Sequence, residues 1–220
     1  MTHQHADAAT NFLYPFIDGN ETDAAALLTD LTESALAKAA ESVALRRSTL
    51  ESCAGLINRA GAEMARRFAA GGRLFAFGNG GSSTDASTFA TLFSQPPTGQ
   101  PLPAWSLTAD QAILTALGND VGFDLVFARQ LIARAGSGDI AVAMSTSGNS
   151  SDLLLALREA RSRGMYTVGF AGYDGGAFVA NPDVDVCFVV RSQSVHRIQE
   201  SQALLGYQLW VAVQAVKDQR

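Results

Sequence analysis

The sequence predicts an α/β protein built on a doubly wound, five-stranded parallel sheet. Two observations indicate this class: short apolar runs alternate with helical patterns from Arg73 onward, and hydroxyl-rich turns follow two of the runs directly. With 220 residues, of which 47% are apolar and 17% charged, the chain is long enough for one sizeable core. We therefore expect a polar leader at residues 1–22 and a single domain over residues 23–220.

Each expected element follows from its apolar spacing. Residues 23–70 are rich in alanine and carry leucines at helical spacing, which predicts two helices there. Further along, the pattern predicts strands at 74–77, 104–107, 139–144, 165–170 and 184–190, and helices at 84–94, 109–117, 123–135, 151–163, 175–180 and 195–217. The last helix is apolar over much of its surface. We expect it to pack with the N-terminal helices in the bundle of a homo-oligomer.

The composition of the chain indicates which partners and which cellular compartment to expect. A net charge of -5 argues against a nucleic-acid surface, which would be basic. No apolar run approaches the length of about 20 residues that crosses a membrane, and the N-terminus lacks the pattern of a signal peptide, so we expect a cytoplasmic protein without a membrane partner. Cys53 and Cys187 have no metal-ligand spacing, and only His196 lies outside the leader. A zinc site of several histidine and cysteine ligands is therefore not expected.

The segment after the strand at 139–144 is rich in hydroxyl groups. Its polar residues are Ser145, Thr146, Ser147, Asn149 and Ser150, with Gly148 between them, and a helix follows. The first N–H groups of a helix have no intrahelical partner and favour an anion, and the hydroxyls add hydrogen-bond donors for phosphate oxygens. The alternative is an ordinary capped turn, because serine and asparagine are common N-caps.

A second segment of this design follows the strand at 74–77. It contains Gly78, Gly80 and Gly81 and continues with Ser82, Ser83 and Thr84. Three glycines in four residues allow a ligand to approach the backbone closely, whereas a structural turn needs only one. Neither the P-loop nor the dinucleotide-binding spacing is present. Because ligands of such sheets bind at the carboxyl ends of the strands, the two segments predict one sugar-phosphate site.

These motifs resemble those of the sugar isomerase (SIS) domain superfamily, and within it the phosphoheptose isomerase group. The resemblance rests on residues 78–82 with 85–86, 118–120 with 122–123, 145–150, 173–176 and 197–200. It implies a flavodoxin-like SIS core and a homotetramer with sites shared between subunits. It also implies that Ser82, Ser145, Thr146, Ser147 and Ser150 hold a sugar phosphate, with Asn79, Gly80, Gly81, Asp120 and Gln199 lining the site.

The resemblance is incomplete at the catalytic positions. Where the phosphoheptose isomerases carry a histidine and a glutamate after the first loop, this chain has Thr88 and Leu92, and Tyr207 stands where the last helix should carry a second histidine. Of the set that implies zinc and the acid–base pair, only Gln199 is present. No cofactor is therefore expected, although the family resemblance leaves zinc open.

A replacement base has to come from other residues. His196 shares a helical face with Gln199, and imidazole transfers protons near neutral pH, but it can equally be an exposed residue at a helix start. Asp120 matches a position that lines the substrate, although Asn-Asp is also ordinary in turns. Glu200 can act as the base or pair with Arg197 on the surface. Asp85 is expected to cap or orient the first loop.

Two functions remain. The first is isomerisation of sedoheptulose 7-phosphate through an enediol to D-glycero-D-manno-heptose 7-phosphate, with His196, Asp120, Glu200 and Gln199 as catalytic candidates. The second is a non-catalytic SIS module that binds a sugar phosphate or a protein partner, as in the relatives associated with replication initiation. The residues at 88 and 92 favour the second function, whereas the intact phosphate segments favour the first.

Overall fold

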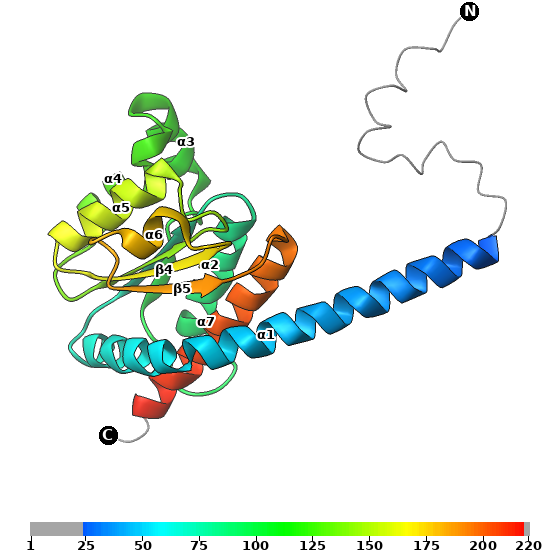
Figure 1. Ribbon diagram of the computed structural model, residues 1–220. Helices are drawn as coiled ribbons and strands as arrows, with labels where there is room; N and C mark the ends of the chain where they lie inside the picture. Colours follow the sequence, from blue (N-terminus) through cyan, green and yellow to red (C-terminus); the bar gives the residue numbers. More distant parts are fainter. Residues whose placement is uncertain (1–23, 218–220) are drawn as a thin grey trace, which may run out of the picture. The chain divides into compact units, whose positions relative to one another are not determined.

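The computed structural model describes residues 24–217 and contains one five-stranded parallel sheet (Figure 1). The strand order is β2-β1-β3-β4-β5, which is the flavodoxin-like order expected from the sequence. The strands are β1 (Leu74–Gly78), β2 (Ala104–Ser106), β3 (Ile140–Met144), β4 (Tyr166–Gly172) and β5 (Val186–Val190). All four neighbouring pairs are parallel, so the doubly wound α/β class is confirmed.

Helices connect the strands and cover both faces of the sheet. They are α2 (Gly81–Ser94), α3 (Gln111–Asp120), α4 (Val126–Arg134), α5 (Ser151–Ser162), α6 (Gly176–Ala180) and α7 (Val195–Lys217), with a 3-10 turn η1 at Phe123–Leu125. In the part of the chain that the structure describes, no helix is long and apolar enough to cross a membrane.

Alternate residues of the strands point into two separate cores. Along β1, Leu74 and Ala76 belong to one core with residues of α2, α7 and the Val43–Ala69 part of α1. Phe75 and Phe77 belong to the other core with residues of α4, α5 and α6. Because every residue of β1 is buried, the strand is apolar throughout, as is usual for a parallel sheet covered on both faces.

The N-terminal region differs from the expectation of two helices, because α1 runs unbroken over Ala24–Ala69. The chain divides into two units at this helix, residues 1–42 and residues 43–220. In the first unit, the described residues 24–42 are helical and expose Leu28 and Leu36. The expected leader at residues 1–22 lies outside the described residues.

Candidate functional site

The two hydroxyl-rich segments lie next to each other because β1 and β3 are neighbours. Gly78 is in register with Met144, so both strands end at the same edge of the sheet. A Cβ atom on Gly78 would lie 2.6 Å from the carbonyl oxygens of Met144 and Ser82, which explains why this position is a glycine. We call residues 79–81 the glycine loop and residues 145–150 the serine loop.

The glycine loop is shorter than the sequence suggested. Helix α2 begins at Gly81 rather than near residue 84, after Gly80 with a φ of 54°. Ser82 is therefore a buried residue of the first helical turn, near the N-terminal end of α2. Its hydroxyl and the N–H groups at the start of this helix are donors of the kind that bind phosphate.

The serine loop is held by its own side chains. The Ser145 hydroxyl accepts a hydrogen bond of 3.0 Å from the Gly148 N–H, and the Ser147 hydroxyl accepts one of 3.3 Å from the Asn149 N–H. Ser150 is the N-cap residue of α5, and its side chain makes no capping hydrogen bond. The hydroxyl of Ser150 thus remains available to a ligand at the start of the helix, together with the N–H groups of the first turn.

A third loop, which follows β4, packs against the serine loop. The Ala177 N–H donates to Asn149 Oδ1 at 2.8 Å. Gly176 has a φ of 54°, and a Cβ atom there would overlap the carbonyl oxygen of Ser147. Gly176, which belongs to the motif at residues 173–176, therefore allows the two loops to pack in direct contact.

Asn79 makes a contact that the sequence did not predict. Its Nδ2 donates to both carboxylate oxygens of Asp152, at 3.0 and 2.9 Å. Asp152 is 3% exposed, and burial raises the pKa of its carboxyl above the usual value, against the opposing effect of the Asn79 hydrogen bond.

Gln199 joins the last helix to the glycine loop. Its Nε2 donates to Asp85 Oδ2 at 2.9 Å, and a Cβ atom on Gly81 would lie 2.5 Å from that same Nε2. Burial raises the pKa of the Asp85 carboxyl, and the Gln199 hydrogen bond opposes the shift. Asp85 was expected to cap or orient the first loop; it is not an N-cap, because α2 begins four residues earlier, and its contact is with Gln199 of α7.

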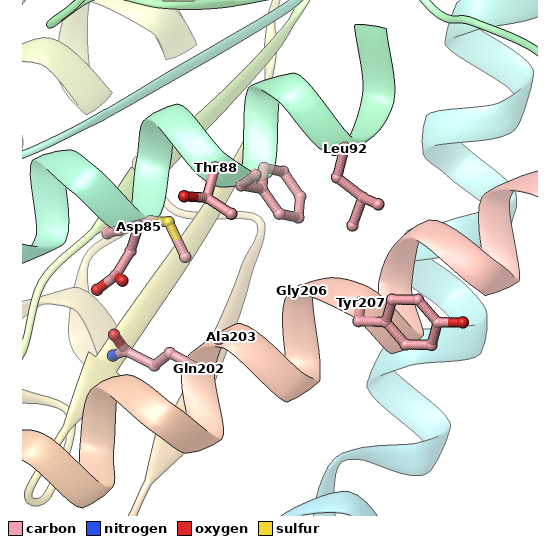
Figure 2. Close-up of a pocket in the computed structure, with 9 residues that line it drawn as sticks. Asp85, Thr88, Leu92, Gln202, Ala203, Gly206 and Tyr207 are labelled. Carbon is pink, nitrogen blue, oxygen red and sulfur yellow. The ribbon is translucent and has the colours of Figure 1, made fainter. Parts of the chain in front are cut away.

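A cavity of about 80 Å³ lies beside Asp85, between α2 and α7 (Figure 2). It is lined by Asp85, Thr88, Phe89, Leu92, Met144, Gln202, Ala203, Gly206 and Tyr207. Three of these, Thr88, Leu92 and Tyr207, stand at the positions where the resemblance implied the zinc and acid–base residues. The structure thus brings these positions together around one cavity, but with a mostly apolar wall.

The residues present do not fit a zinc ion. Structural and catalytic zinc sites use at least three histidine, cysteine or carboxylate ligands, whereas this cavity offers the Asp85 carboxylate with neutral amide and hydroxyl groups. Among residues 24–217, no group of three or more histidine, cysteine, aspartate or glutamate side chains could hold a metal ion.

The other catalytic candidates lie on the surface. His196 is exposed in the first turn of α7, and Asp120 is exposed at the end of α3, where it accepts from Asn119 Nδ2 at 2.8 Å. Glu200 forms an ion pair of 2.7 Å with Arg46 from α1. Of the four predicted catalytic residues, Gln199 contacts α2, through its hydrogen bond to Asp85.

Two buried polar residues at the site were not predicted. They are Asp152, described above, and Gln202, whose Nε2 donates to the Ser145 carbonyl oxygen at 2.7 Å. A signal for Gln202 was present, because it lies three residues after Gln199 and helical spacing places both on one face. Asp152 had no such signal, since an acidic residue in the first turn of a helix is common.

Comparison with known proteins identifies the class. The family model of the SIS domain matches residues 35–172. The phosphoheptose isomerase of Solidesulfovibrio magneticus is 43% identical over 175 residues, which cover 77% of this chain and 82% of that protein. The solved phosphoheptose isomerase of Neisseria gonorrhoeae superposes with a TM-score of 0.78 at 34% identity, covering 84% of this chain and 99% of that one. The solved phosphoheptose isomerase of Francisella tularensis superposes with a TM-score of 0.78 at 29% identity, covering 84% of this chain and 98% of that one.

Fold and site together define an α/β domain with a five-stranded parallel sheet and two hydroxyl-rich loops at adjacent strand ends. In agreement with this architecture, the chain belongs to the SIS domain family and, within it, to the phosphoheptose isomerase group.

Proposed function

We propose that this protein interconverts sedoheptulose 7-phosphate and D-glycero-D-manno-heptose 7-phosphate. The observation that carries the proposal is the extent of the likeness: 43% identity over 82% of a relative named phosphoheptose isomerase, together with the shared fold. The geometry supports the same substrate class, because the glycine loop and the serine loop offer N–H and hydroxyl donors to one phosphate at adjacent strand ends.

The reaction moves hydrogen between adjacent carbons. A base takes the proton from C1 of the open-chain ketose, and the electrons of that C–H bond form the C1=C2 double bond of an enediol as the C2 oxygen gains a proton. Return of a proton to C2, with loss of the O1 proton, gives the aldehyde at C1. The protein has to hold the phosphate, bind both oxygens and place one acid–base group near C1 and C2.

The proton-transfer group remains one of the residues predicted from the sequence. His196, Asp120 and Glu200 are the candidates, and we place His196 first because it shares α7 with Gln199. Gln199 then orients the sugar and Asp85. The serine loop residues Ser145, Thr146, Ser147 and Ser150 hold the phosphate with Ser82.

We also propose that the chemistry proceeds without zinc. The support is the donor set of the cavity, where Leu92 and Tyr207 offer no metal ligand of the kinds that zinc prefers. The same residues favour the second candidate function, a sugar-phosphate-binding module without turnover. Turnover itself therefore separates the two candidates.

The first test is NMR of sedoheptulose 7-phosphate with the purified protein, alone, with added zinc and with a chelator. We expect aldose signals to appear equally in all three samples. His196→Ala should lower turnover with little change in affinity for the phosphosugar, whereas Gln193→Ala, an exposed change three residues earlier, should alter neither. Broadened ligand signals without turnover would support the binding module instead, and turnover only with zinc would contradict the metal-free chemistry.

The assembly and compartment are part of this proposal. Tyr207 and Val211 on α7 are 45% and 37% exposed, and Leu28 and Leu36 in residues 24–42 are 64% and 67% exposed. Apolar side chains exposed on long helices favour association, and a homotetramer with sites at subunit interfaces is the form we expect, in the cytoplasm. Light scattering on the purified protein tests the subunit number.

A further inference from the structure

Gln202 is a buried amide with one half of its hydrogen-bonding capacity in use. Its side chain is 0% exposed, and its Nε2 donates to the Ser145 carbonyl oxygen at 2.7 Å. A carbonyl oxygen can only accept, so this contact fixes which end of the amide is nitrogen. The other end, Oε1, has no hydrogen-bond partner among the described residues.

Gln202, which carries the unpartnered oxygen, belongs to the wall of the 80 Å³ cavity. Figure 2 shows the amide end of Gln202 on α7 and the carboxylate of Asp85 on α2 pointing toward each other across it. Thr88 and Tyr207 carry hydroxyl groups in the same wall, but neither is bonded to Gln202 Oε1. The apolar residues Phe89, Leu92 and Met144 supply no donor. A buried acceptor without a donor is costly, so a site of this kind favours a ligand that carries one.

Another buried glutamine of the same helix has both ends of its amide bonded. Gln214 is also buried, at 6% exposed, and both ends of its amide are bonded: Nε2 donates to the Gln100 carbonyl oxygen at 2.9 Å, and Oε1 accepts from the Gln100 N–H at 3.1 Å. Gln214 is therefore a structural residue. Gln202 differs from it because its free oxygen faces a cavity next to the serine loop.

We propose that Gln202 is a substrate-binding residue, whose Oε1 accepts a hydrogen bond from the C1 hydroxyl of the open-chain ketose phosphate while its Nε2 holds the serine loop that binds the phosphate. This proposal rests on the proposed function for the identity of the ketose. In the reacting end of that ketose, C2 carries a carbonyl oxygen, which cannot donate, and the C1 hydroxyl is the donor. One side chain then links the two ends of the substrate site.

The decisive experiment is a double-mutant cycle in binding. Sedoheptulose 7-phosphate and its 1-deoxy analogue, which lacks the C1 hydroxyl, are titrated calorimetrically into the wild-type protein and into Gln202→Met. Removing either partner should weaken binding about tenfold, and removing both should weaken it no further. Inorganic phosphate, titrated as a second probe, reports whether the serine loop is intact in the variant.

Matched variants separate ligand binding from folding. Gln214→Met removes a buried amide from the same helix and should leave the affinity for both sugars unchanged. Ala203→Phe places a large ring at the cavity from an exposed position and should abolish binding of the sugar phosphate, whereas Ala215→Phe, at an exposed position three turns further along α7, should not. Both alanines are exposed, so the phenylalanines are not forced into a core.

The outcomes distinguish this inference from the proposed function. If Gln202→Met binds the ketose phosphate as tightly as the wild type, or still discriminates against the 1-deoxy analogue, the role of Gln202 is wrong even where the wild type isomerises the sugar. If the wild type shows no turnover but the cycle gives the expected coupling, the isomerase function fails and the role of Gln202 stands.

Discussion

Asn79 of the glycine loop and Asp152, two residues after the serine loop, are joined by hydrogen bonds of 3.0 and 2.9 Å from one amide nitrogen to both carboxylate oxygens. Asn79 follows β1, and Asp152 lies in the first turn of α5. Because Asp152 is only 3% exposed, water cannot readily replace the amide. The pair therefore fixes the distance between the glycine loop and the serine loop.

Asn79→Ala should lower the free energy of unfolding by about 1–3 kcal/mol at neutral pH, because it leaves a buried carboxylate without its side-chain partner. The loss should shrink as the pH falls, since protonated Asp152 has less need of a donor. Burial already raises the pKa of Asp152 in the folded protein, so this protonation begins above the usual range of an aspartate. Urea unfolding at several pH values measures the effect.

Asn119→Ala is the matched control for Asn79→Ala. Asn119 Nδ2 also donates to a carboxylate, that of Asp120 at 2.8 Å, but both residues are exposed. An exposed pair contributes little to the free energy of unfolding, so Asn119→Ala should lower it by at most about 0.5 kcal/mol. Equal decreases in the free energy of unfolding of the two variants would show that burial does not strengthen the Asn79–Asp152 pair.

Ser147→Ala combined with Ser150→Ala tests the serine loop as the phosphate site. The double variant should bind inorganic phosphate and the sugar phosphate at least about tenfold more weakly, because each hydroxyl lost is a donor to a charged oxygen. Ser162→Ala, at the other end of α5, removes a hydroxyl that donates to the Glu159 carbonyl and should change neither affinity. Retained phosphate binding in the double variant would exclude the loop as the phosphate site.

The sheet and its loops were predictable because their signal is local. Apolar runs, glycines and hydroxyls stand in the same order as the strands, turns and helix starts, and the resemblance supplied the strand order. The single helix α1 was not predicted. Two helices were expected because the apolar residues of this region fall into two separate stretches, near residues 27–31 and 56–68. A Cβ atom on Gly61 would lie 2.7 Å from the Ala212 side chain, so this glycine permits close packing of α1 against α7.

The buried polar contacts could not be predicted, because their partners are distant along the chain. Asn79 meets a carboxylate 73 residues away, and Gln202 meets a carbonyl 57 residues away. Only the packed sheet and helices bring these groups together. Thr88 and Tyr207 are likewise distant along the chain. The sequence shows that neither residue is one of the usual zinc ligands, but only the fold shows that both line one cavity.

Glu63 on α1 gives a stability prediction with a defined pH range. Its carboxylate accepts from Arg66 and Arg67 at 2.7 Å, and these contacts, Arg66 foremost, lower its pKa from 4.5 to about 2. A carboxyl with a lowered pKa in the folded state stabilises that state fully at pH values above its pKa in the unfolded state. This stabilisation is lost as the pH falls from 4.5 through about 2. Because the group is partly exposed, Glu63→Gln should cost only about 0.5–1 kcal/mol at pH 7.

The difference between wild type and Glu63→Gln should therefore disappear in acid. Urea unfolding at neutral pH and near the lowered pKa measures it, with Glu51→Gln on the exposed face of the same helix as control. A difference that persists unchanged at the acid end would show that the two arginines do not act through the charge of Glu63.

Gly176→Ala tests whether the loop after β4 shapes the phosphate site. A Cβ atom at residue 176 would overlap the Ser147 carbonyl oxygen and crowd Asn149 Oδ1 at 2.8 Å. The serine loop would have to move, so we expect binding of inorganic phosphate to be lost while the fold is retained. Calorimetric titration with phosphate and circular dichroism measure the two effects separately.

The control for Gly176→Ala is Gly138→Ala, which shares its backbone strain without the overlap. Gly138 also has a positive φ, of 94°, but nothing lies within 4 Å of its Cβ position. An alanine at either site costs about 1–2 kcal/mol for the left-handed backbone. Only Gly176→Ala should also lose phosphate binding, since only that residue touches the serine loop. Equal phosphate affinity in the two variants would mean that the serine loop holds its shape without support from the loop that follows β4.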